Sequence, residues 1–96
     1  MEKGGWVYVV ASKTLVLYTG VTNNLGRRAW EHKEHLIDGF TKRYNCDRLI
    51  YMEHHPTIED AIVREKQLKK WRRDKKLWLI KQLNPDLRDL YEDLNR

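Results

Sequence analysis

Hydrophobic and polar residues alternate near the N-terminus, and this pattern predicts a β-hairpin. Residues 6–11 and residues 15–21 are rich in β-forming side chains, and the polar residues 12–14 separate them. Side chains of a strand point alternately to its two faces, so Tyr8 and Tyr18 share a face whenever paired residue numbers add to an even value. A turn centred on Lys13 would place Tyr8 directly opposite Tyr18, whereas a two-residue loop would separate the two tyrosines.

Apolar residues next recur every three or four positions, which predicts an amphipathic helix over residues 25–37. Residues 22–24 (Thr-Asn-Asn) supply N-cap candidates for its first turn. Arg28, His32 and His35 lie four and three residues apart, so they form a polar stripe beside the apolar one.

The second half of the chain continues with a short strand and more helices. After an expected loop at residues 40–44, the apolar residues 49–52 predict a third strand. Helices are expected from residue 58 and over residues 71–83. Asn84 followed by Pro85 is typical of a helix start, so we predict a last amphipathic helix from this point.

One carboxylate falls among the apolar positions of the helix expected from residue 58. Glu65 lies three residues from both Ile62 and Leu68, on the stripe that should face the core. Burying a carboxylate is costly unless it is paired, hydrogen-bonded or bound to a metal. A buried salt bridge and a metal ligand are therefore both open interpretations of Glu65.

Composition is that of a soluble globular chain, and its charge is unevenly distributed. The 96 residues are 41% hydrophobic and 34% charged, which suits a single domain over residues 1–96. Cys46 is the only cysteine, which excludes an intramolecular disulfide and a cysteine-based zinc site. No apolar run approaches the roughly 18 residues of a membrane span, and residues 1–5 do not resemble a signal peptide, so we expect a cytoplasmic protein.

The whole net charge of +5 arises between residues 59 and 83, where basic residues exceed acidic ones while the rest of the chain balances. A basic segment can simply be a solvated helix face. Trp71 and Trp78 lie within it, however, and aromatic residues among basic ones favour binding to a phosphate backbone. Two tyrosines on one sheet face, an arginine and a half-buried carboxylate would together suit a phosphate-binding site.

Five short motifs, in order along the chain, resemble those of the GIY-YIG nucleases. Residues 6–8 (Trp-Val-Tyr) and 18–20 (Tyr-Thr-Gly) resemble the paired tripeptides that name the family. The resemblance continues through residues 25–33, 61–66 and 84–87, which correspond to the helix motif, the metal-binding helix and the closing asparagine. It spans residues 5 to 91 and is strongest to small stand-alone bacterial members. Trp6 and Thr19 depart from the family pattern, which has glycine and isoleucine at these positions.

The resemblance implies an α+β fold, with a three-stranded, mainly antiparallel sheet flanked by helices. Tyr8 and Tyr18 would lie against the scissile phosphate, and Arg28 would stabilise the pentavalent phosphate. His32 would take part in proton transfer, and Glu65 would hold one divalent cation, Mg²⁺ or Mn²⁺. A supporting polar residue near the site would be Asn84.

The implied function is hydrolysis of DNA phosphodiester bonds, with 5′-phosphate and 3′-hydroxyl products; RNA is not excluded. We expect a monomer that does not associate with membranes. Two alternatives remain open: a nucleic-acid-binding module that does not cut, and a subunit in DNA repair or recombination that depends on a protein partner for targeting. The residues expected to contact nucleic acid are Lys33, Lys66, Lys69, Lys70, Arg72 and Arg73.

Overall fold

A computed structural model describes residues 4–95 of the chain. Residues 1–3, on which part of the signal-peptide prediction rests, and residue 96 lie outside this range. Three strands, β1 (Gly5–Ala11), β2 (Leu17–Thr22) and β3 (Arg48–His55), form one antiparallel sheet in the order β2-β1-β3. The predicted α+β class with a three-stranded antiparallel sheet is confirmed.

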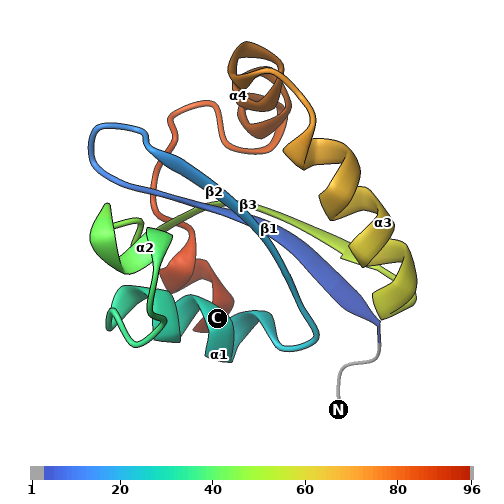
Figure 1. Cartoon of the computed structure of the whole chain (residues 1–96), viewed down its shortest axis with the longest axis horizontal. Helices are drawn as coiled ribbons and strands as arrows, with labels where there is room; N and C mark the ends of the chain where they lie inside the picture. Colours follow the sequence, from blue (N-terminus) through green and yellow to red (C-terminus); the bar gives the residue numbers. More distant parts are fainter. Residues whose placement is uncertain (1–3, 96) are drawn as a thin grey trace.

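Helices cover both faces of the sheet (Figure 1). Helices α3 (Ile58–Lys69) and α4 (Arg73–Leu83) lie on one side, while α1 (Leu25–Lys33), the four-residue α2 (Phe40–Arg43) and the short 3₁₀ helix η1 (Tyr91–Asn95) lie on the other. The alternation of β1 explains these layers, because its even-numbered residues pack against α1 and its odd-numbered residues pack against α3 and α4. No helix within residues 4–95 is both long and apolar enough to cross a membrane.

The hairpin confirms that the two tyrosines share a face but corrects their register. Tyr8 pairs with Gly20, and Tyr18 pairs with Val10. The numbers of paired residues therefore add to an even value, as the shared face requires. This sum is larger by two than the sum that a turn centred on Lys13 would give. The turn is longer on its C-terminal side: Leu15 takes a left-handed conformation with φ 63°. Tyr8 therefore lies opposite a glycine rather than opposite Tyr18.

Helix α1 ends at Lys33, four residues earlier than predicted, although its N-cap at Asn24 is as expected. His35 adopts a left-handed φ of 57°, and the backbone N–H groups of His35 and Leu36 donate to carbonyls of the preceding turn. This arrangement is a Schellman motif, in which a residue with positive φ ends a helix. The segment expected as a loop then contains α2.

The predicted last helix from Pro85 is wrong. Asn84 ends α4 instead of starting a new helix, and its buried side-chain amide donates to the backbone carbonyls of Ile50 (3.1 Å) and Arg88 (2.8 Å). Leu87 has a positive φ of 52°, which a helix cannot accommodate. These long-range hydrogen bonds outweigh the local helix-start signal, and the chain runs without helix to η1.

Candidate active site at the free edge of the sheet

Tyr8 enters the site from β1, and Gly20 makes room for it. A Cβ atom at Gly20 would lie 2.4 Å from the Tyr8 hydroxyl oxygen, which is closer than any real contact. The tyrosine ring therefore crosses directly over the backbone of β2, and its hydroxyl points toward the edge of the sheet that β2 forms. This close approach explains the glycine in the second tripeptide.

His32 of α1 binds the Tyr8 hydroxyl. The distance between Tyr8 Oη and His32 Nε2 is 2.8 Å, and His32 Nδ1 lies 3.2 Å from the hydroxyl oxygen of Thr41 in α2. His32 is 3% exposed, and its burial, together with the nearby Arg28 charge, lowers the pKa of its imidazole to about 4. The imidazole is therefore neutral at physiological pH, with one nitrogen available as a proton acceptor.

Arg28 lies one turn before His32 and also acts on Tyr8. Burial raises the pKa of the Tyr8 hydroxyl to about 12, although the N–H groups and charge of Arg28 oppose this shift. Despite partial burial, the contacts with Tyr8 and Glu31 raise the pKa of the Arg28 guanidinium. Tyr8 thus stays protonated at neutral pH, and its hydroxyl can donate to Nε2 of a His32 imidazole whose proton is on Nδ1.

Tyr18 lies beside these groups and is more accessible. It is half-buried, its ring centroid lies 5.9 Å from that of His32, and it also approaches Phe40 of α2 at 6.1 Å. The structure therefore brings together four residues that the sequence predicted as catalytic: Tyr8, Tyr18, Arg28 and His32.

Glu65 reaches the same place from α3, on the other side of the sheet. Its side chain is 12% exposed and forms an ion pair with Lys69 at 3.0 Å, while the Lys69 ammonium lies 5.8 Å from the Tyr18 ring centroid. Because Lys69 approaches the Tyr18 ring, its ion pair brings the Glu65 carboxylate to the Tyr18 side of the cluster. The Glu65 charge is the smallest of the causes that raise the pKa of Tyr8. The site thus spans the edge of β2, with groups from both faces of the sheet.

The buried face of α3 differs slightly from the predicted stripe. Ala61 and Leu68 are buried and Glu65 lies between them, but Ile62 is 36% exposed. A salt bridge was one of the two interpretations left open for Glu65, and the structure contains an ion pair between Glu65 and Lys69. The Lys69 side chain is half-exposed. A flexible, solvated lysine can move away from the carboxylate, so this ion pair does not prevent Glu65 from binding a cation.

Glu65 is the acidic residue that could hold a metal at this site. Within residues 4–95 no group of three or more His, Cys, Asp or Glu residues could hold an ion together. Magnesium commonly binds one or two carboxylates and keeps several water ligands, so a single carboxylate beside an open edge fits it. The donor set does not fit zinc, which requires three or four protein ligands.

Two predicted site residues have other partners. The Lys33 ammonium pairs with Asp89 and lies 5.2 Å above the Tyr91 ring, so it fastens the C-terminal segment to α1. The contacts of Asn84 go to β3 and to Arg88 rather than to the tyrosine cluster. Nucleic-acid contact by Lys33 and a supporting role for Asn84 stay predictions.

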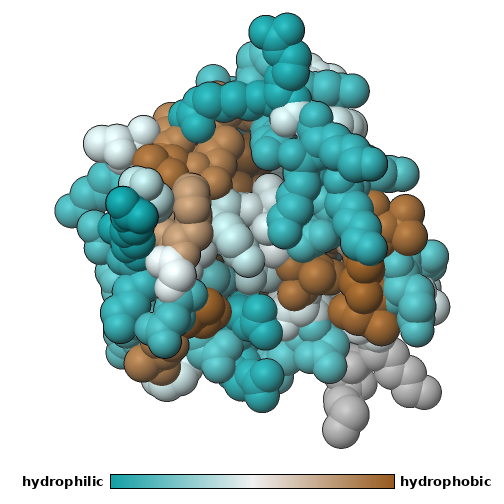
Figure 2. All heavy atoms as spheres, viewed as in Figure 1, coloured by the Kyte–Doolittle hydropathy of each residue, from teal (hydrophilic) through white to brown (hydrophobic). Residues whose placement is uncertain are grey.

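The basic residues predicted to contact nucleic acid on α3, on α4 and between these helices are all exposed. Hydrophilic side chains cover much of the face seen in Figure 2. Thr41 and Phe40 were missed by the sequence analysis, because a four-residue helix shows no periodicity. The exposed basic residues are Lys66, Lys69, Lys70, Arg72 and Arg73.

Comparison with known proteins agrees with this geometry. A family model of the GIY-YIG catalytic domain matches residues 4–77, which include the tyrosine cluster and Glu65 but not Asn84. A UPF0213 protein of Syntrophus aciditrophicus is 35% identical over 82 residues, which cover 84% of this chain and 93% of that protein. A UPF0213 protein of Staphylococcus aureus (strain N315) is 34% identical over 77 residues, 80% of this chain and 94% of that protein. No solved structure matches significantly. The chain therefore belongs to the GIY-YIG family, a nuclease superfamily.

Proposed function

We propose that this protein is a metal-dependent endonuclease that hydrolyses phosphodiester bonds of DNA and leaves 5′-phosphate and 3′-hydroxyl ends. The observation that carries the proposal is the Tyr8 hydroxyl, which lies 2.8 Å from a neutral histidine and beside an arginine and a carboxylate. Hydrolysis requires a proton acceptor, a cation for the phosphate and an anchor for a metal, and His32, Arg28 and Glu65 supply these groups.

The exposure of each group supports a position for it relative to the substrate. Tyr8 is 1% exposed, whereas Tyr18 is half-buried and the Arg28 side chain is 33% exposed. Tyr18 and Arg28 therefore lie against the phosphate, and Tyr8 lies behind them at the base of the opening. In this position Arg28 can stabilise the negative charge that develops on the pentavalent phosphate.

Proton transfer runs inward from the attacking water. As the water oxygen bonds to phosphorus, its proton passes to the Tyr8 oxygen while Tyr8 passes its own proton to His32 Nε2. The bond from phosphorus to the 3′ oxygen breaks, and that oxygen takes a proton from solvent. With its proton on Nδ1, His32 can donate to the Thr41 hydroxyl oxygen 3.2 Å away, and Nε2 is then the proton acceptor.

Glu65 would hold Mg²⁺ or Mn²⁺, whose charge offsets that of the phosphate oxygens when the ion is bound. Lys69 must leave the Glu65 carboxylate for this to occur, and its flexible side chain can then contact a substrate phosphate instead.

The Glu65–Lys69 ion pair also favours a second candidate, a nucleic-acid-binding module that does not cut. If Lys69 stays on Glu65, the carboxylate is neutralised and no cation binds. This alternative predicts salt-sensitive binding of DNA without turnover under any divalent ion. Targeting by a protein partner would be compatible with either candidate.

Cleavage of end-labelled DNA by wild type, Glu65→Gln and Glu59→Gln tests the proposal. Glu59 is an exposed acid on the same helix, so its variant matches the charge change away from the site. We expect wild type and Glu59→Gln to cut in Mg²⁺ or Mn²⁺ and to stop in chelator, and Glu65→Gln to lose cutting. If Glu65→Gln cuts DNA, or if wild type cuts DNA in chelator, the metal assignment is wrong. If wild type binds DNA but does not cut it, the result would favour the nucleic-acid-binding module that does not cut.

A further inference from the structure

Two adjoining hollows extend from the candidate active site along the edge of β2. The first, of about 300 Å³, adjoins the site and is lined by Leu17, Tyr18, Thr19, Phe40, Lys69 and Lys76. The second, of about 430 Å³, continues to the turn between β1 and β2. Because the hollows share Leu17 and Lys76, they form one groove, which we call the edge groove.

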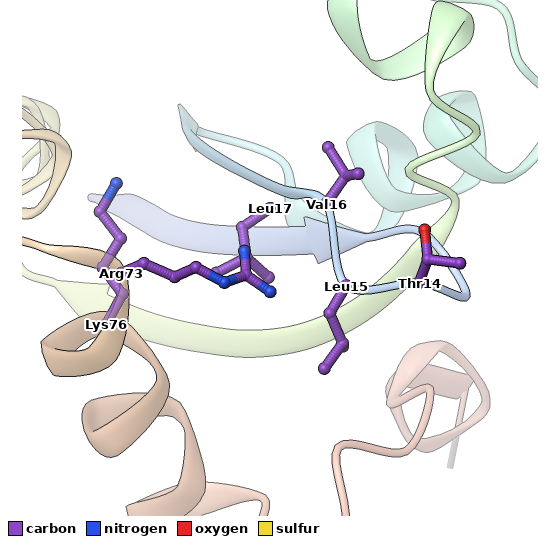
Figure 3. Close-up of a pocket in the computed structure, with 6 residues that line it drawn as sticks. All are labelled: Thr14, Leu15, Val16, Leu17, Arg73 and Lys76. Carbon is purple, nitrogen blue, oxygen red and sulfur yellow. The ribbon is translucent and has the colours of Figure 1, made fainter.

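Side chains from α4 form one wall of the far half of this groove. Figure 3 shows Arg73 and Lys76 on α4, with the Arg73 guanidinium extended toward Leu17 of β2. The facing wall consists of Thr14, Leu15 and Val16 in the turn. The groove thus passes between the first turn of α4 and the hairpin.

The charge of the edge groove is entirely positive. Its lining contains Lys69, Lys76 and Arg73 and no acidic residue. Arg73 and Lys76 form no ion pair with any acid of residues 4–95, whereas Arg64 and Lys33 are both paired with carboxylates. The unpaired cations Arg73 and Lys76, spaced along a groove, favour an anionic ligand that is itself extended.

The apolar surfaces of the groove narrow the choice of ligand. Leu15 and Leu17 also line the groove, and Phe40 at the site end is 46% exposed with the ring of Tyr44 4.8 Å from its own ring. A polynucleotide carries regularly spaced phosphates together with sugars and bases that can lie on apolar and aromatic groups. An acidic peptide or a single small anion would leave part of this surface unused.

We propose that the edge groove binds the phosphodiester backbone of the strand that is cut, on one side of the scissile phosphate. Lys76 and Arg73 contact successive phosphates beyond the one held at Tyr18. The inference rests on the proposed function, since the groove begins at the site where the bond would be broken. The shared chemistry is one phosphodiester strand, which either single-stranded or duplex DNA could supply.

Salt-dependent binding tests the groove separately from catalysis. Fluorescence anisotropy in chelator, with a labelled oligonucleotide either single-stranded or duplex, measures affinity over a range of salt concentrations. The slope of log K against log salt is negative, and each lost phosphate contact should reduce its magnitude by about 0.7 for a single strand or about 0.9 for a duplex. We expect one such step for Lys76→Gln and two for the double variant Arg73→Gln/Lys76→Gln.

Lys81→Gln is the matched control, because Lys81 lies on the same helix, is exposed and does not line the groove. It should keep the wild-type slope. Equal slopes for Lys76→Gln and Lys81→Gln, or an unchanged slope for the double variant with both probes, would overturn the inference, as would a wild type that binds neither probe. The probe, single-stranded or duplex, that shows these changes in slope identifies the form of DNA that supplies the strand. Binding with the expected steps but without cleavage in Mg²⁺ would support the groove and refute only the nuclease proposal.

Discussion

The buried His32 should make the protein less stable in acid, by an amount that the structure sets. Its pKa falls from an ordinary 6.5 to about 4, chiefly through burial. The unfolded chain therefore takes up a proton at a higher pH than the folded chain does. The contribution of His32 to folding is complete above about pH 6.5 and is lost as pH falls toward about 4, with a total loss of roughly 3 kcal/mol.

Urea denaturation of wild type and His32→Gln at several pH values isolates this contribution. Glutamine keeps a group that can accept the Tyr8 hydroxyl proton but does not titrate. Between about pH 7 and about pH 4.5, wild type should lose about 2 kcal/mol more stability than the variant. Other acid-sensitive groups, such as Glu53 with its lowered pKa, are common to both proteins and cancel in the difference.

Two results would refute this reasoning. Parallel stability profiles for wild type and His32→Gln would show that the imidazole does not change its proton affinity on folding. An NMR titration of the His32 ring with a midpoint near about 6.5 would show the same directly.

Three further substitutions test the packing that supports the site. Gly20→Ala should destabilise the fold by about 1–3 kcal/mol in thermal denaturation, because the added Cβ would lie 2.4 Å from the Tyr8 hydroxyl oxygen. Gly26→Ala is the control: its added Cβ would have no non-local atom nearer than 4.0 Å, so it should be neutral or stabilising. Tyr8→Phe should leave DNA binding intact and slow cleavage by about 10²-fold or more in single-turnover assays; unchanged cleavage would exclude the relay. Asn84→Ala should cost about 1–3 kcal/mol in urea denaturation, since it leaves buried backbone carbonyls unpaired, and a loss of cleavage in the still-folded variant would instead indicate a role at the site.

Much of the candidate site was predictable because local rules determine it. Strand alternation predicted Tyr8 and Tyr18 on one face for any even sum of paired residue numbers, and the observed pairing has such a sum. The anomalous Glu65 was visible as a carboxylate among apolar positions, because core-facing helix stripes rarely contain one. The family resemblance then supplied roles that spacing could not.

Features that depend on contacts between distant segments were not predictable. The exact register of the hairpin follows from the left-handed Leu15 in the turn, which the sequence does not signal. Asn84 and Pro85 have the local pattern of a helix start, but hydrogen bonds from Asn84 to β3 and to residue 88 determine the observed path.

Cleavage in ¹⁸O-labelled water tests the central claim most directly. Wild-type protein is incubated with end-labelled DNA and Mg²⁺, and the product ends are analysed by mass spectrometry. Attack of water on phosphorus, with departure of the 3′ oxygen, predicts one ¹⁸O atom in the 5′-phosphate and an unlabelled 3′-hydroxyl. Products with a 3′-phosphate, or DNA that stays intact with Mg²⁺ and with Mn²⁺ in both single-stranded and duplex form, would contradict the account.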